Sequence, residues 1–288
     1  MNNYLNLLEE ATEKLIELGK IEEFKNELLS EAPPVLWFGD NSVSKRKIVT
    51  IGANPSREEF LSENKFKAQE RLISGKRLQY LKNPSNRFKH LGPNQEWSSI
   101  LKDRTLQEEI IISYNNYFKR NPYKWFGKKG RGDDLSYNVE GFINGLDASY
   151  YDGTNKYQCL HIDLMPFPTI SDFTSILKES EEHVFKDEWS KKFLDELVKE
   201  INPKTIVVFG RTNLKYFQRF LGLEDIGNGH TFSSLKENGK SSSANYWLFK
   251  YKNIDVIGLS VNLGNPKGFN KITLREFGNE IKQKNNAT

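Results

Sequence analysis

The hydrophobic and polar positions of the chain follow two periods, one typical of helices and one typical of strands. Apolar residues recur at helical spacing through residues 3–30, and Gly19 divides this segment into two expected helices. The same period predicts helices at 105–120, 186–201, 212–221 and 270–283. Short β-branched runs predict strands at 47–52, 158–164, 204–209, 245–251 and 254–261. Strands that alternate with helices indicate an α/β fold, expected as a three-layer α/β/α arrangement around a mostly parallel central sheet.

Breaks in this pattern set the expected domain organisation. Pro33 and Pro34 end the first helical segment, so we expect an N-terminal helical extension over residues 1–45. Residues 46–285 form the expected α/β domain. Within it, residues from about 105 to 156 are expected to form a large insertion. After its first helix this segment becomes rich in Gly, Asp and Tyr and loses any regular period.

Composition excludes several classes of protein. No apolar run approaches the ~20 residues of a membrane span, and the first residues lead into an acidic amphipathic segment instead of a signal peptide's apolar core. The single cysteine, Cys159, has no partner for an internal disulfide, and no Cys/His cluster has zinc-site spacing. We therefore expect a cytoplasmic protein with no membrane contact, no metal, no cofactor and no obligate protein partner.

The positive charge of the chain is concentrated in clusters. The net charge is only +4, but residues 1–31 are acidic on balance and four later segments are basic. These segments are Lys45–Lys47, Lys76–Arg77, Lys119–Arg120 and Lys124–Arg131. Aromatic residues lie between several of the basic ones, which suits a polyanion that also presents flat rings. Nucleic acid is the partner that this pattern favours.

Two loops follow β-branched strands near opposite ends of the chain. The strand at 48–51 leads into Gly52-Ala53-Asn54-Pro55-Ser56. The strand at 256–261 is followed by Asn265-Pro266-Lys267-Gly268-Phe269-Asn270-Lys271 and then by a helix. Open α/β sheets bind ligands at the C-terminal ends of their strands, so both loops lie where such a fold presents its chemistry.

Together the two loops resemble the active-site motifs of the uracil-DNA glycosylase superfamily. The nearest pattern is that of the mismatch-specific uracil/thymine branch, which reads G-x-N-P-G in its first motif and N-P-S-G-L-S, then a helix, in its second. Asn83–Phe88 is similar to the H-P-A-N-R-F segment of that branch, and Lys204–Gly210 is similar to its penultimate strand. These four segments occur in the matching order along the chain.

The resemblance implies a monofunctional DNA N-glycosylase in which Asn54 holds the attacking water. It also implies base contacts from Asn86 and Asn265, and a pocket wall near Tyr80 and Leu81, where the small enzymes carry a base-stacking Phe. The base-contacting residues of the first loop are Gly52, Ala53, Pro55 and Ser56. Ser56 departs from the family, which has Gly at this position. The alternative for Asn54 is that it only supports the turn.

The resemblance further implies that the second loop binds DNA. Phe269 occupies the position of the Leu that enters the base stack in place of the flipped nucleotide. Lys267 and Lys271 would contact phosphates at a helix N-terminus. The remaining DNA-contacting residues of this loop are Pro266, Gly268 and Asn270. The alternative for Phe269 is a packing contact with Ile272 of the following helix.

The strand at 158–164 carries the residues expected to read the base. In related branches an Asn of this strand reads the edge of uracil or thymine. The aligned residue here is Asp163, with His161 on the same face. A carboxylate accepts a hydrogen bond from the N4 amine of cytosine, and a buried, protonated Asp163 or His161 would protonate the departing base. The alternative is that the two residues are only hydrogen-bonded to each other within the fold.

An enzyme that removed ordinary cytosine would destroy its host's genome, so the expected base is a modified cytosine. The aromatic and acidic residues between about 105 and 156 have the composition of a sugar-contacting surface. The pattern resembles the anti-phage glycosylases of this superfamily that excise glucosylated hydroxymethylcytosine from viral DNA. Two alternatives remain, namely a repair glycosylase for uracil, thymine or a damaged base, and a non-catalytic nucleic-acid sensor.

Overall fold

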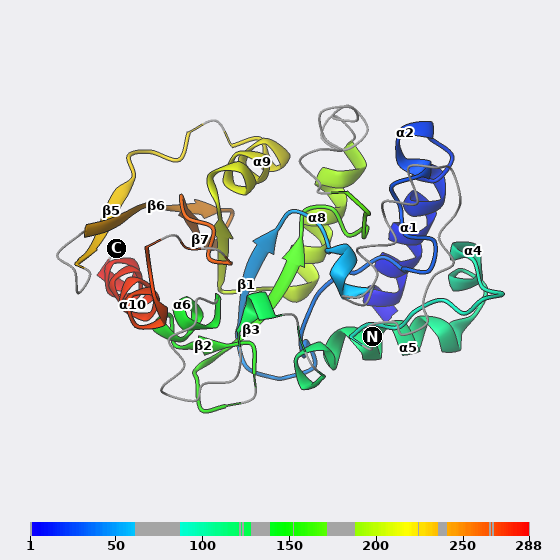
Figure 1. Cartoon of the computed structure of the whole chain (residues 1–288), viewed down its shortest axis with the longest axis horizontal. Helices are drawn as coiled ribbons and strands as arrows, with labels where there is room; N and C mark the ends of the chain where they lie inside the picture. The colour runs from blue at the N-terminus through cyan, green and yellow to red at the C-terminus, as the bar shows by residue number, and fades with distance from the viewer. Residues whose placement is uncertain are drawn as a thin grey trace.

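A seven-stranded mixed sheet forms the centre of the fold (Figure 1). The structure is a computed structural model that describes residues 2–60, 87–120, 122, 124–127, 139–151, 153–171, 188–223, 225–235, 241–264, 266 and 268–287. The strands are β1 (Lys47–Gly52), β2 (Ala148–Ser149), β3 (Tyr157–Asp163), β4 (Thr205–Phe209), β5 (His230–Leu235), β6 (Ser241–Tyr251) and β7 (Ile254–Leu259). Their order is β2-β3-β1-β4-β7-β6-β5, with the first five parallel and the last two antiparallel.

Helices cover both faces of this sheet. The α-helices are α1 (Asn2–Leu18), α2 (Glu22–Lys25), α4 (Trp97–Ile100), α5 (Arg104–Asn115), α6 (Val139–Gly145), α8 (Glu188–Ile201), α9 (Arg211–Leu221) and α10 (Lys271–Ala287). Gly258 of β7 faces Leu214 of α9, whereas Tyr246, paired with Leu259, contacts Phe277 of α10. Residues 258 and 259 point to opposite faces of their strand, so α9 and α10 lie on opposite sides (Figure 1).

The connections of the parallel strands diverge near the middle of the sheet. The chain leaves β1 toward β3, and it leaves β4 toward β7 on the other side. In open α/β sheets such a point of divergence creates a crevice at the C-terminal ends of the strands. The first loop, 52–56, lies directly at this point because it follows β1.

The expected α/β fold with a mostly parallel sheet is confirmed, and every expected strand and helix named above is present with small shifts at its ends. β5 was not expected, because its Ser- and Asn-rich surroundings have the composition of a loop. α6 and β2 were not expected either. They lie in the segment predicted to be an irregular insertion, yet Phe142 and Tyr150 there are fully buried.

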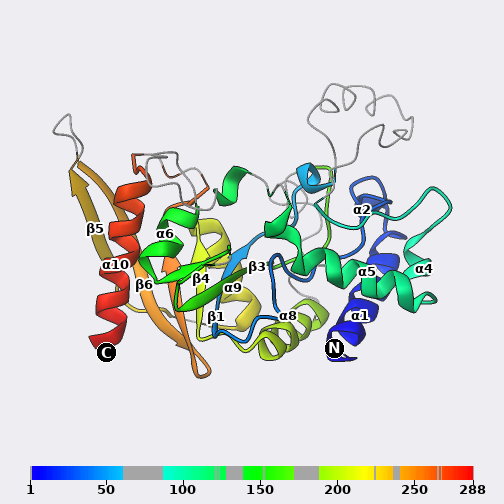
Figure 2. The same cartoon turned by 90° about the horizontal axis from the view of Figure 1, so that it is seen from below.

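The N-terminal segment belongs to the same hydrophobic core as the sheet. α1 packs on α4, α5 and α8, and Val35, Trp37 and Phe38 are at most 2% exposed. The backbone of Phe38 exchanges hydrogen bonds with that of His161 at 2.8 and 3.1 Å. Buried side chains of residues 1–45 and of the sheet therefore form one continuous cluster. Figure 2 shows α1, α2, α4 and α5 at one end of the molecule and β5 with α10 at the other. None of the described helices is both long and apolar enough to cross a bilayer.

Candidate functional site

The loop after β1 is fixed against the end of β3. The backbone N–H groups of Leu164 and Met165 donate to the carbonyls of Gly52 and Ala53 at 3.1 and 3.0 Å. Gly52 leaves space that a side chain would fill, because an added Cβ would meet the Asp163 carboxylate and lie 2.9 Å from Nε2 of His161. The glycine therefore lets two side chains of β3 cross the end of β1.

Asn54 is oriented through its amide nitrogen. Nδ2 donates to Oγ1 of Thr169 at 2.8 Å and lies within reach of the Phe167 carbonyl at 3.4 Å. Among the described residues, no donor contacts Oδ1. The side chain is half-buried, so its oxygen remains an acceptor on a group that cannot rotate without losing its Thr169 contact. This orientation fits the expected role of holding a water molecule, although the turn-supporting alternative uses the same contacts.

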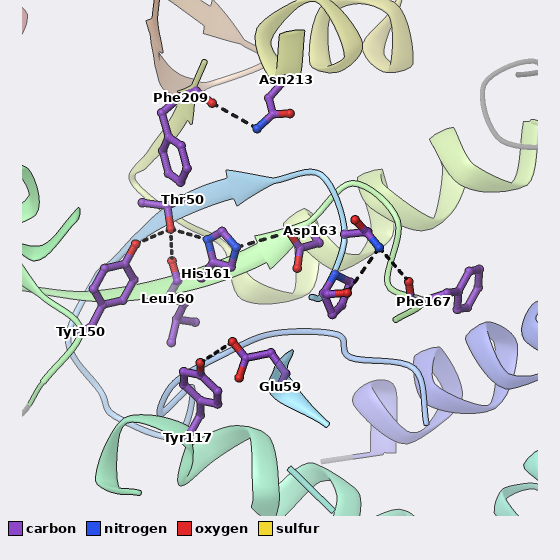
Figure 3. Close-up of polar contacts among 12 residues, drawn as sticks. Thr50, Glu59, Tyr117, Tyr150, Leu160, His161, Asp163, Phe167, Phe209 and Asn213 are labelled. Carbon is purple, nitrogen blue, oxygen red and sulfur yellow. Dashed lines mark hydrogen bonds and ion pairs between the residues drawn. The ribbon is translucent and has the colours of Figure 1, made fainter. Parts of the chain in front are cut away.

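His161 and Asp163 form a buried pair on β3 (Figure 3). Nε2 of His161 lies 3.3 Å from Oδ1 of Asp163, and the two residues are 4% and 5% exposed. On the other side of the ring, Nδ1 lies 2.9 Å from Oγ1 of Thr50. Thr50 also contacts the Tyr150 hydroxyl at 2.6 Å and the Leu160 carbonyl at 3.2 Å. Thr50 contacts both Tyr150 and His161, so the imidazole ring of His161 is held between Thr50 on one side and Asp163 on the other. The expected juxtaposition of His161 and Asp163 is therefore present.

Glu59 is a second acidic group at this site, and sequence reasoning missed it. It belongs to the short 3₁₀ turn η1 (Arg57–Glu59) immediately after the first loop, and it is 3% exposed. Oε1 accepts a hydrogen bond from the Tyr117 hydroxyl at 2.8 Å. Oε2 lies 3.5 Å from Nη1 of Arg87 and has no hydrogen bond. Figure 3 shows Glu59 and Tyr117 on the side of His161 and Asp163 away from Phe209.

Burial raises the pKa of Glu59 to about 7, against the opposing effects of Arg87 and the Tyr117 hydrogen bond. The negative charge of Asp163 raises this pKa further. Glu59 is thus poised to hold or release a proton near neutral pH, which is the property required of a general acid. Within the described part of the chain, no three His, Cys, Asp or Glu side chains are arranged to hold a metal ion.

Aromatic rings enclose His161. Phe38, Phe126 and Trp125 lie 5.0, 5.2 and 5.5 Å from it, measured between ring centroids. Trp125, in the 3₁₀ turn η5 (Lys124–Phe126), is half-buried and also contacts Phe209 of β4. Its indole occupies the position that a Cβ on Gly264 would take. Trp125 therefore joins the site to the loop that precedes the second motif.

The second loop does not present Phe269 as an exposed wedge, so this expectation is wrong. Phe269 is 2% exposed and packs against Phe232 of β5 and Phe277 of α10. Phe269 does pack inside the protein, as the alternative prediction held. Its expected neighbour Ile272, however, is 54% exposed. The error has a physical cause, since the apolar surface that receives Phe269 includes the unexpected strand β5.

The other predicted residues of the second loop are only partly described. Asn270 caps α10, because its Oδ1 accepts from the backbone N–H of Thr273 at 2.9 Å and Thr273 Oγ1 accepts from the Asn270 N–H at 2.9 Å. Pro266 is buried, and Gly268 has a φ of +92° that favours glycine. The residues Tyr80, Leu81, Asn86, Asn265 and Lys267, and the side chain of Lys271, lie outside the described residues.

The tyrosines predicted to contact a sugar lie largely in the core. Tyr117, Tyr150 and Tyr151 are 0%, 1% and 9% exposed. Their rings stack with or abut Phe118 and Phe126. They therefore build the wall behind His161 and offer no sugar-binding surface.

Comparison of the sequence with models of known protein families gave no match, and comparison with curated proteins gave none either. The resemblance to the glycosylases consequently rests on the short motifs, and the argument for function rests on the chemistry of the site.

Proposed function

We propose that this chain is a monofunctional DNA glycosylase with a three-layer glycosylase-like fold. The observation that carries the proposal is the buried group of Glu59, His161 and Asp163 beside the anchored amide of Asn54, at the C-terminal ends of β1 and β3. Hydrolysis of an N-glycosidic bond passes through an oxocarbenium-like sugar while negative charge develops on the departing base. It therefore requires an oriented water and a proton donor, and this group offers both.

In this mechanism the roles of the side chains are distinct. Oδ1 of Asn54 accepts a hydrogen bond from the attacking water and aims it at the sugar carbon. Glu59, Asp163 or His161 protonates the base as the bond breaks. The first loop has no Lys or Cys to form a covalent intermediate, so the product is an abasic site without strand cleavage.

The proposed base is a cytosine derivative, because Asp163 accepts from an exocyclic amine and cytosine leaves more readily when protonated. A modified cytosine of phage DNA, such as a glucosylated hydroxymethylcytosine, would spare the host genome and place the enzyme in antiviral defence. The burial of Tyr117, Tyr150 and Tyr151 removes these residues as sugar contacts. Discrimination of the modification would thus depend on other parts of the chain.

Trp125 borders the acidic group on the side of His161. Glu59, His161 and Asp163 are each at most 5% exposed, and the half-buried indole lies against His161 and Phe209. A flipped base entering this space would displace the indole or stack on it. Base flipping followed by stacking in a closed pocket is how enzymes reach atoms hidden in a duplex.

The test is to incubate the protein with DNA carrying plain, hydroxymethylated or glucosylated cytosine, and with uracil-containing DNA, and to measure released bases and abasic sites. We expect release of modified cytosine only. Asn54→Ala should abolish release while leaving folding and DNA binding intact, whereas Asn228→Ala, at an exposed position before β5, should have no effect. Undiminished release by Asn54→Ala would refute the catalytic assignment.

Two other functions are outcomes of the same experiment. Efficient release of uracil, with no release of any cytosine derivative, would identify a repair glycosylase in which Asp163 does not read the base. DNA binding without release of any base would identify a non-catalytic sensor. If the proposal is correct, Asp163→Asn should reduce release of modified cytosine by roughly one to two orders of magnitude, because a buried partner is left unmatched.

A further inference from the structure

A cavity lies at the opposite ends of the parallel strands from Asn54. It has a volume of about 220 Å³, and its apolar floor includes Ile48 at the start of β1 and Ile257 of β7. Lys156, Tyr157, Lys204 and Lys282 line it from β3, from the approach to β4 and from α10. Ile48, Tyr157 and Thr205 lie at the N-terminal ends of β1, β3 and β4, whereas the candidate site lies at the C-terminal ends of β1 and β3.

Positive charge in this cavity is not neutralised. Nζ of Lys204 donates to the Tyr157 hydroxyl at 3.2 Å and lies 5.2 Å from the centroid of its ring. Nζ of Lys156 lies 5.3 Å from the same centroid. Within the described residues, no carboxylate forms an ion pair with Lys156, Lys204 or Lys282. Among the residues that line the cavity, Asp147 is the single carboxylate. Its one negative charge cannot balance the positive charges of three lysines.

The pKa of Tyr157 is shifted in the direction that this excess of positive charge predicts. Partial burial raises the pKa of Tyr157, but the hydrogen bonds and charges of Lys204 and Lys156 outweigh this effect and leave that pKa below its ordinary value. Tyr157 is buried as a residue, and its hydroxyl accepts the hydrogen bond from Lys204 at the cavity wall. Asn285, which donates to Asp255 at 3.4 Å, and Thr205 complete the polar lining.

We propose that this cavity binds a small phosphate-bearing molecule, either inorganic phosphate or a compact phosphomonoester. A dianion with three or more acceptor oxygens suits a cavity lined by three lysines and a tyrosine hydroxyl. The volume is below the ~300 Å³ at which drug-sized ligand pockets begin, so a large ligand does not fit. The apolar floor of Ile48 and Ile257 would accommodate the small body of an ester.

The phosphates of DNA held at the candidate site are a separate source of the same chemistry. Strands of five to seven residues separate the two edges of the parallel sheet. At ~3.3 Å per residue the edges are roughly 17–23 Å apart, so a duplex over the first loop does not extend into this cavity. The cavity is therefore assigned to a free ligand, and this assignment does not depend on the glycosylase proposal.

The experiment measures binding of inorganic phosphate to the full chain by calorimetry at constant ionic strength, with chloride as the reference anion. We expect saturable binding at one site, and a roughly tenfold loss of affinity in both Lys204→Met and Lys282→Met, because each removes a charge-assisted hydrogen bond. Lys215→Met, an exposed lysine of α9, is the matched control and should retain wild-type affinity.

A second arm separates the two phosphate sources. Affinity for a single-stranded oligonucleotide should be the same in Lys282→Met as in the wild type, and saturating phosphate should not displace the oligonucleotide. The proposal is overturned if phosphate binds no better than chloride, or if Lys215→Met loses as much affinity as the two cavity variants. Loss of oligonucleotide binding in Lys282→Met would also overturn it, because the cavity would then be part of a DNA surface.

Discussion

Replacement of Glu59 by glutamine tests the acidic group without reference to any substrate. The pKa of this carboxyl rises from 4.5 to about 7 on folding, chiefly because burial disfavours its charged form. A carboxyl with a higher pKa in the folded state stabilises the fold fully below pH 4.5, and this contribution is lost as the pH rises through about 7. An amide cannot ionise, so Glu59→Gln lacks this dependence.

The magnitude follows from the two pKa values. At about 1.4 kcal/mol for each pH unit, ionisation of buried Glu59 costs about 3 kcal/mol of folding free energy above pH 7. The amide oxygen can still accept from the Tyr117 hydroxyl, so Glu59→Gln is expected to differ little from the wild type near pH 4.5. It should then become more stable than the wild type by up to about 3 kcal/mol near pH 8.

The assay is urea unfolding of both proteins at intervals from pH 4.5 to 8.5, with the difference in unfolding free energy plotted against pH. Glu276→Gln, at an exposed position of α10, is the control and should give a flat difference. A flat difference for Glu59→Gln as well would refute the buried-acid assignment. The same variant should also slow base release if Glu59 is the proton donor.

Three further predictions concern neighbouring features. Tyr117→Phe removes a hydrogen bond that lowers the pKa of Glu59, so the midpoint of the stability profile should move to higher pH; an unchanged midpoint would show that this bond does not act on Glu59. Phe269→Ala should lower the free energy of unfolding by about 3–5 kcal/mol, measured by urea unfolding, because a buried ring is deleted. Unchanged stability with slower processing of duplex DNA alone would instead support insertion of Phe269 into the base stack. Gly264→Ala should displace the indole of Trp125 and change its fluorescence, whereas an unchanged spectrum would contradict the close approach.

The sequence pattern was sufficient to predict five of the seven strands and most helices, because their apolar positions are read directly from spacing and β-branched runs. Segments whose burial depends on distant partners were missed. Tyr150 and Phe142 lie among Gly, Asp and Asn residues typical of loops, and only their contacts with Phe118 and with Phe277 of α10 make them core.

At the candidate site too, some residues could be predicted from the local sequence and others could not. Residues two apart on one strand must share a face, so the pairing of His161 and Asp163 was predictable from β3 alone. Glu59 follows Glu58 in a polar segment and has the pattern of a solvated residue. Its burial arises from Tyr117, 58 positions later in the chain, and no local pattern encodes that contact.

The backbone contact between Phe38 and His161 has a consequence for how copies of this protein meet. β2 covers the outer edge of β3 at Tyr157 and Gln158, and Phe38 covers it further along. Exposed strand edges recruit strands from other molecules. Removal of the first 45 residues would therefore expose the edge of β3 beside His161, and the shortened protein should self-associate more than the full chain does.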